Sequence, residues 1–245
     1  MLDDLKLDNI LFLDIETAPQ YERFDLVPDQ FKELWDKKSA YFREEGQLAA
    51  DVYQRAGIYS EFGKIICISV GIIILKDDQR FFRLKSFFGD DESVLLEEFV
   101  QMLKKYHNSK SDVQLCAHNG KEFDFPYIAR RMLINGLRLP KILDIAGKKP
   151  WEVKFLDTME LWKFGDYKNY TSLNLLTHVF NIPTPKDDID GSMVADVYWK
   201  EQDLNRIVKY CEKDVLAIAQ LLTRFKGEEL IKPENVESAT ENRLV

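Results

Sequence analysis

The sequence predicts an α/β protein with one mixed β-sheet that is flanked by helices on both faces. Three observations lead to this fold class. Apolar runs rich in β-forming residues lie at 9–16, 65–75 and 80–88. Residues 92–106 then carry apolar side chains at spacings of three and four, which is typical of a helix. From residue 113 onward, strand-like runs alternate with helix-like ones, so two later strands are expected to be parallel.

The first three strands are expected to form an antiparallel meander, because the four polar residues 76–79 supply a hairpin turn between the second and the third. The fourth strand, 113–119, gives way to a helix at 125–136 with Pro126 in its first turn. A short fifth strand follows at 155–159. Further helices are predicted at 170–180, after residue 192 and at 203–225.

Two segments lie outside this frame. Residues 18–62 separate the first two strands by far more than a hairpin needs, and their charged and aromatic content predicts two amphipathic helical pieces. This insertion either packs on the edge of the sheet or covers and guides a substrate; both interpretations remain open. Residues 227–245 are polar and acidic without apolar periodicity, which predicts a flexible tail. The expected organisation is therefore one domain, 1–226, followed by that tail.

Composition excludes several classes of protein. A chain of 245 residues that is 45% hydrophobic can bury a sizeable core. No run of about 18 apolar residues occurs and the N-terminus is acidic, so we expect a cytoplasmic protein without a membrane partner. The cysteines Cys67, Cys116 and Cys211 stand far apart, which excludes a CxxC zinc or redox motif and favours buried thiols.

Acidic residues occur in patterns that predict a metal site. Asp14 and Glu16 end the first apolar run, and because they are two residues apart in a strand they point to the same face. Tyr210 and Asp214 are four residues apart in a helical stretch and also share a face. Asp124 lies where the fourth strand gives way to a helix. Carboxylates that share a face attract a divalent cation.

Order and spacing of these residues resemble the DEDD group of 3′-5′ exonucleases, and no motif position departs from the pattern. The three motifs are DxE at Asp14-Ile15-Glu16, Asn followed five residues later by Asp at Asn119 and Asp124, and YxxxD at Tyr210 and Asp214. The tyrosine marks the DEDDy branch. Within it, the chain is most similar to predicted exonucleases related to the proofreading domain of family-B DNA polymerases, through 56–71 and 170–176. The resemblance runs from about residue 8 to about residue 226.

The resemblance implies a ribonuclease H-like fold and a two-metal-ion mechanism. Asp14, Glu16, Asp124 and Asp214 would hold two divalent ions, Mg²⁺ or Mn²⁺, with Asp14 bridging both. Glu16 and Asp214 would complete the ion on the side of the nucleophile, and Asp124 would hold the ion on the side of the leaving group. Tyr210 would orient the attacking water. The implied activity is removal of nucleotides from the 3′ end of single-stranded DNA.

Four further residues are candidates for substrate binding by the same resemblance. Asn119 would hydrogen-bond the substrate near its 3′ end, and Phe123 would stack on a terminal base. The backbone around Ile15 and Thr17 would contact the 3′-hydroxyl. Structural explanations compete with the first two, because an Asn at a strand end often caps a turn and a Phe before a helix is often core.

The sequence leaves two alternative functions open and does not identify a protein partner. The motifs do not separate DNA from RNA, so the chain could be a 3′-5′ exoribonuclease. A fold alone does not establish chemistry, so a non-catalytic nucleic-acid-binding module is also possible. The net charge of −8 is unfavourable for binding nucleic acid, although residues 121–186 contain 11 Lys or Arg against 7 Asp or Glu. The sequence does not identify a polymerase or repair protein as a partner.

Overall fold

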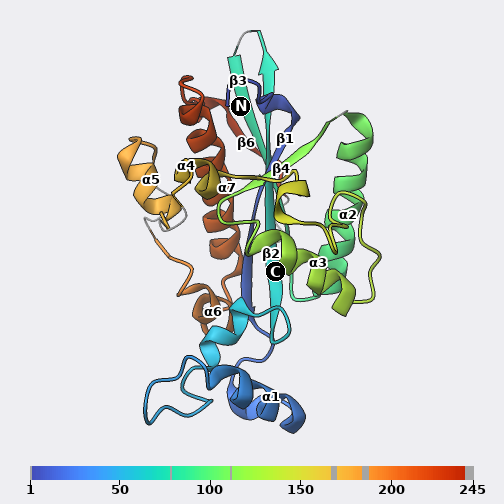
Figure 1. The fold of residues 1–245 in the computed structure, drawn as a ribbon, viewed down its shortest axis with the longest axis vertical. Helices are drawn as coiled ribbons and strands as arrows, with labels where there is room; N and C mark the ends of the chain where they lie inside the picture. The colour runs from blue at the N-terminus through green and yellow to red at the C-terminus, as the bar shows by residue number, and fades with distance from the viewer. Residues whose placement is uncertain (1, 78, 111, 167–169, 184–187, 241–245) are drawn as a thin grey trace.

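The computed structural model describes residues 2–77, 79–110, 112–166, 170–183 and 188–240 (Figure 1). In this part of the chain the strands are β1 Ile10–Pro19, β2 Gly63–Lys76, β3 Gln79–Phe88, β4 Gln114–Ala117, β5 Leu156–Asp157 and β6 Val236–Ser238. The α-helices are α1 Asp29–Ser39, α2 Glu92–Ser109, α3 Asp124–Ile134, α4 Thr158–Lys163, α5 Leu173–Val179, α6 Val194–Asp196 and α7 Leu204–Phe225. None of the described helices is both long and apolar enough to cross a lipid bilayer.

All of the described strands belong to one mixed sheet, in the order β5-β4-β1-β2-β3-β6. β1 pairs antiparallel with β2, and β2 pairs antiparallel with β3, as the predicted meander requires. β4 lies parallel to β1, and β5 lies parallel to β4. The predicted three antiparallel and two parallel strands are therefore confirmed. β6, which was not predicted, adds a further parallel strand beside β3.

Side chains of β1 alternate between two cores, as expected for a central strand. Leu11, Leu13 and Ile15 belong to the core under α2 and α3. Ile10 and Phe12 belong to the core under α7. Figure 1 shows α7 on one side of the sheet and α2 and α3 on the other. Asp14 and Glu16 continue the row of Ile10 and Phe12 along β1, so their carboxylates face α7.

The insertion between β1 and β2 contains two main helical pieces, as predicted, and the first of them is α1. Its second piece is a 3₁₀ turn, Tyr53–Ile58. Tyr53 and Ala56 are three residues apart and both pack in a small core around the fully buried Trp35, and this spacing suits a 3₁₀ turn. The Trp35 indole also donates a hydrogen bond of 2.9 Å to the Ala49 carbonyl. The insertion thus has a core of its own.

Contacts from α3 attach the insertion to the sheet. The hydroxyl of Tyr127 donates to the Gly57 carbonyl at 2.7 Å. Arg131 Nη1 donates to the Ser60 carbonyl at 2.9 Å. These bonds show that the insertion packs against α3. A role of the insertion in guiding a substrate stays a prediction.

The prediction of a flexible tail from residue 227 is wrong for the segment that forms β6. Backbone pairing with β3 and polar side chains hold this strand, so apolar periodicity gave no sign of it. Glu212 on α7 accepts hydrogen bonds of 2.9 Å from the hydroxyls of Ser86 and Ser238 and another from the Thr240 hydroxyl. Residues 241–245 of the predicted tail lie outside the described residues.

Replacing Glu212 by alanine is expected to release β6 from β3. A hydrogen bond to a charged group contributes about 1.5–3 kcal/mol, and the Glu212 carboxylate accepts three of them. Limited proteolysis should therefore cut residues 233–240 faster in the variant. Glu237→Ala, which removes an exposed carboxylate from β6 itself, is the matched control. Equal cutting of both variants would show that Glu212 does not hold the strand.

Candidate metal centre

The end of β1 presents two carboxylates to α7. Asp14 and Glu16 follow Phe12 on the same side of the strand, and Glu16 is only 7% exposed. The pairing of β1 with β2 shifts register between Glu16 and Thr17, so the strand is irregular where the carboxylates stand. Such irregularities re-aim side chains and are frequent beside active sites.

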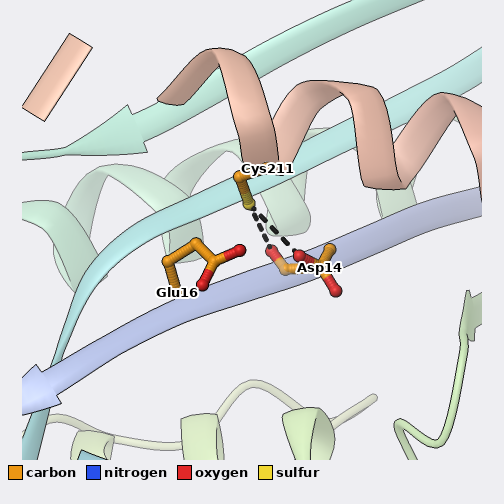
Figure 2. Close-up of side chains that lie close together, drawn as sticks. All are labelled: Asp14, Glu16 and Cys211. Atoms are coloured by element: carbon orange, nitrogen blue, oxygen red, sulfur yellow. Dashed lines mark hydrogen bonds between the residues drawn. The ribbon is translucent and has the colours of Figure 1, made fainter. Parts of the chain in front are cut away.

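α7 brings Tyr210, Cys211 and Asp214 to this edge of β1. All three are buried, because the apolar face of the helix packs across β1, β2 and β3. Positions 210 and 214 are one turn apart, and 211 precedes 214 by three residues, so the three side chains share one face. The Cys211 thiol lies 3.5 Å from Asp14 Oδ2 (Figure 2).

Asp124 reaches the same place from the start of α3. It is 3% exposed, and its Oδ1 accepts a hydrogen bond of 3.1 Å from the backbone amide of Ile15. The turn before it needs a small residue, because a Cβ on Gly120 would lie 2.3 Å from the Cβ of Ala117. Asn119 adopts a left-handed conformation with φ of 62°, which asparagine tolerates better than most residues.

A buried carboxylate holds this turn. Asp157 is 2% exposed and accepts hydrogen bonds from the amides of Asn119 and Lys121 at 2.9 and 3.0 Å. It also caps α4 through the amides of Met159 and Glu160. One side chain therefore ties the loop between β4 and α3 to the start of α4.

The clustered carboxylates raise one another's proton affinity. Burial is the largest cause that raises the pKa of Asp14 well above its ordinary value, and the carboxylates of Asp124, Asp214 and Glu16 raise it further. Burial and Asp214 likewise raise the pKa of Glu16. Burial raises the pKa of Asp124 to about 7, against hydrogen bonds from its own amide and that of Ile15. The cluster therefore carries an excess of negative charge that a cation would relieve.

Because of this excess charge, the stability of the metal-free protein is expected to depend on pH. The folded-state pKa of Asp124, about 7, exceeds its unfolded value of about 3.9. Between these values the folded state binds more protons than the unfolded state, so the free energy of unfolding falls as pH rises from about 4 to about 7. In EDTA, Asp124→Asn should raise the melting temperature more at about pH 8 than at about pH 5. An equal change at both pH values would contradict the raised pKa.

The structure brings all five predicted catalytic residues to one place, and the four predicted substrate-binding residues lie on β1 or just before α3, near these carboxylates along the chain. The Oδ1 of Asn119 is buried without a hydrogen-bond partner. Phe123 is half-buried, with its ring tilted against Tyr127 at a centroid distance of 5.3 Å. The amide of Ile15 already donates to Asp124, so it is not free to meet a 3′-hydroxyl. Thr17 is half-buried beyond the register shift.

Sequence analysis missed the position of Cys211. It was expected to be one of three buried thiols, and all three are buried. Its spacing of three residues from Asp214 was the available signal that it faces the carboxylates.

The residues present fit a divalent ion that prefers oxygen ligands. Four carboxylates from β1, α3 and α7 offer hard oxygen donors, as Mg²⁺ and Mn²⁺ require. Glu16 is only 7% exposed, and its carboxylate has no hydrogen-bond partner among the described residues. A carboxylate that is largely withdrawn from water and makes no hydrogen bond is stabilised by a cation beside it.

Comparison with known proteins gives a family match. The model of a family described as predicted 3′-5′ exonucleases related to the exonuclease domain of PolB matches residues 58–235. The matched range contains Asp124, Tyr210 and Asp214 and begins after Asp14 and Glu16.

Two solved structures are similar to the chain. A family B DNA polymerase from the hyperthermophilic archaeon Pyrobaculum calidifontis has a TM-score of 0.53 at 14% identity, over 88% of this chain and 24% of the polymerase. The chain thus corresponds to about a quarter of that polymerase's length, and the likeness confirms the predicted ribonuclease H-like fold. The RNase domain of the yeast Pop2 protein has a TM-score of 0.35 at 12% identity, over 94% of this chain and 81% of that domain.

Proposed function

Because the chain belongs to the family of predicted 3′-5′ exonucleases related to the exonuclease domain of PolB, we propose that it shortens single-stranded DNA from its 3′ end in a metal-dependent reaction. One observation carries this proposal. Carboxylates from three separate elements converge on one site and raise each other's pKa. Bound cations would neutralise the repulsion within such a site.

In this proposal, Asp14, Glu16, Asp124 and Asp214 hold two divalent ions. When bound, such ions supply an activated water and neutralise charge on the leaving oxygen of a phosphodiester. The chain's own contribution is to fix the carboxylates in advance. The Ile15 amide holds Asp124 by its Oδ1, and β1 keeps Asp14 and Glu16 on the side of α7. This fixed geometry lowers the cost of organising the site for reaction.

Tyr210 keeps its proton and acts as a hydrogen-bond donor. Burial and the carboxylates of Asp214, Glu16 and Asp14 raise the pKa of its phenol far above the ordinary value of about 10. It therefore cannot serve as a base at neutral pH. The phenol is also hydrogen-bonded to Asp214, and we assign it the task of orienting the attacking water through its hydroxyl oxygen.

Asn119 and Phe123 are proposed to bind the terminal nucleotide. The unpartnered Oδ1 of Asn119 can accept a hydrogen bond from a sugar hydroxyl or a base, which would satisfy a buried group that is costly when unpaired. The half-buried ring of Phe123 is suited to contact a base. The backbone of Thr17 remains as the candidate for the 3′-hydroxyl, because the Ile15 amide already donates to Asp124.

The test is to incubate the purified protein with 5′-labelled single-stranded DNA, matched RNA and duplex DNA, each with Mg²⁺, Mn²⁺ or EDTA. The proposal expects a ladder of products shortened from the 3′ end of single-stranded DNA, only with metal. Shortening of RNA but not DNA would replace the proposal by an exoribonuclease. Binding without shortening under every condition would favour a non-catalytic module.

A further inference from the structure

A thiol lies among the carboxylates of this site. Figure 2 shows Asp14 and Glu16 on the strand and Cys211 on the helix that crosses it, with the sulfur directed toward Asp14. The Sγ atom is 3.5 Å from both the backbone oxygen and Oδ2 of Asp14. One donor atom from each of the three residues lies within 4.8 Å of the others. Oxygen-preferring ions make no use of such a sulfur, because Mg²⁺ is bound by oxygen.

The side chain of Glu16 is a second sign of a ligand at this place. The residue is 7% exposed, and no hydrogen bond to its carboxylate is found in the described chain. Figure 2 shows this carboxylate turned toward Asp14 and Cys211. A buried, unpartnered carboxylate aimed at a thiol and a second carboxylate offers three donors of mixed softness to one ion.

The distance between sulfur and oxygen agrees with ligation of one tetrahedral ion. Zinc binds thiolate sulfur at about 2.3 Å and carboxylate oxygen at about 2.0 Å. At a tetrahedral angle these bond lengths place the two donors about 3.5 Å apart. The observed separation of Cys211 Sγ and Asp14 Oδ2 is 3.5 Å. The Glu16 carboxylate would reach the same ion by rotating about its own side-chain bonds.

We propose that Asp14, Glu16 and Cys211 bind a thiophilic divalent ion, Zn²⁺ or Cd²⁺, as an inhibitory site that excludes Mg²⁺ or Mn²⁺ from the carboxylates. The exclusion rests on the proposed function, because it uses Asp14 and Glu16 in both sets of ligands. Binding replaces the S–H bond of Cys211 by a metal–sulfur bond, and the thiol proton passes to solvent. Loss of that proton also ends the donation from Cys211 to Asp14, which frees the Asp14 oxygen to ligate.

The test is a Cd²⁺ titration of the full chain, followed by the ultraviolet charge-transfer absorption of a cadmium–thiolate bond. Cys211→Ser keeps a hydroxyl donor toward Asp14 but removes the sulfur, and it should abolish the band and weaken Cd²⁺ binding by at least about 100-fold. Cys116→Ala removes an equally buried thiol on β4 and should keep the band. Excess Mn²⁺ should reduce the band in the wild-type protein.

Three results would overturn the proposal: no band in the wild-type protein, a band that survives in Cys211→Ser, or a band lost only in Cys116→Ala. The first would mean that the Cys211 thiol serves only as a hydrogen-bond donor to Asp14. Glu16→Gln gives a second variant that keeps the sulfur, and it should weaken binding while the band remains at saturation. These readouts need no nucleic acid, so they are independent of whether the protein degrades DNA.

Discussion

Asp14→Asn is expected to reduce metal-dependent shortening of single-stranded DNA on the order of 10³-fold or more, because the proposal has the Asp14 carboxylate bind both ions. Asparagine has nearly the same shape, so the loss reports charge and ligation rather than packing. In EDTA the same variant should melt at a higher temperature than the wild type. The Asp14 carboxylate is disfavoured in its charged form by burial and by the carboxylates of Asp124, Asp214 and Glu16.

Opposite effects on activity and stability distinguish a functional site from a structural one. The measurement pairs a nuclease assay with thermal denaturation in EDTA and in Mn²⁺. Mn²⁺ should stabilise the wild type more than the variant, since a ligand that binds the folded state raises its stability. Asp144→Asn removes an exposed aspartate and should change neither quantity. Unchanged activity in Asp14→Asn would remove Asp14 from the proposed mechanism.

Arg131→Ala is expected to lower the free energy of unfolding by about 3–5 kcal/mol, because it breaks a buried ion pair. Arg131 and Glu92 are 3% and 7% exposed, and the guanidinium Nε lies 2.9 Å from Glu92 Oε1. The same Glu92 carboxylate accepts from the Ile65 amide at 2.7 Å, and Arg131 also donates to the Ser60 carbonyl. Its loss leaves a buried charge on Glu92 and frees one end of the insertion.

The melting temperature should fall by roughly 10 °C, since about 1 kcal/mol corresponds to a few degrees in a chain of this length. Urea denaturation followed by circular dichroism gives the free energy directly. Arg130→Ala, at the exposed neighbouring position on α3, should cost less than about 0.5 kcal/mol. A loss of similar size in both variants would show that the buried pair contributes no more than an ordinary surface arginine.

The sheet could be predicted because local pattern and tertiary environment agree along its strands. In β1, apolar residues alternate between two cores and the acidic residues follow on the face of α7. The same regularity placed Asp14 and Glu16 on one face, and helical spacing did so for Tyr210 and Asp214. Their convergence with Asp124 could be expected only from the resemblance, because distance along the chain does not reveal distance in space.

Features held by polar contacts or by local aromatic packing escaped prediction. β6 is fixed through hydroxyl groups that meet Glu212, a pattern without apolar periodicity. The second helical piece of the insertion was predicted, but its 3₁₀ form was not, because that form follows from packing against Trp35. The turn at Asn119 depends on Asp157, which lies 38 positions along the chain. In each case the deciding contact is non-local, so a sequence window could not show it.

The central claim is that the carboxylates of β1, α3 and α7 hold two divalent ions. Anomalous diffraction from crystals grown with Mn²⁺ and a nucleoside monophosphate measures this directly. The account predicts two manganese peaks, both beside the Asp14 carboxylate, in the wild-type protein, and the loss of at least one of them in Asp14→Asn. Manganese that binds elsewhere, or no peak among Asp14, Glu16, Asp124 and Asp214, would contradict it.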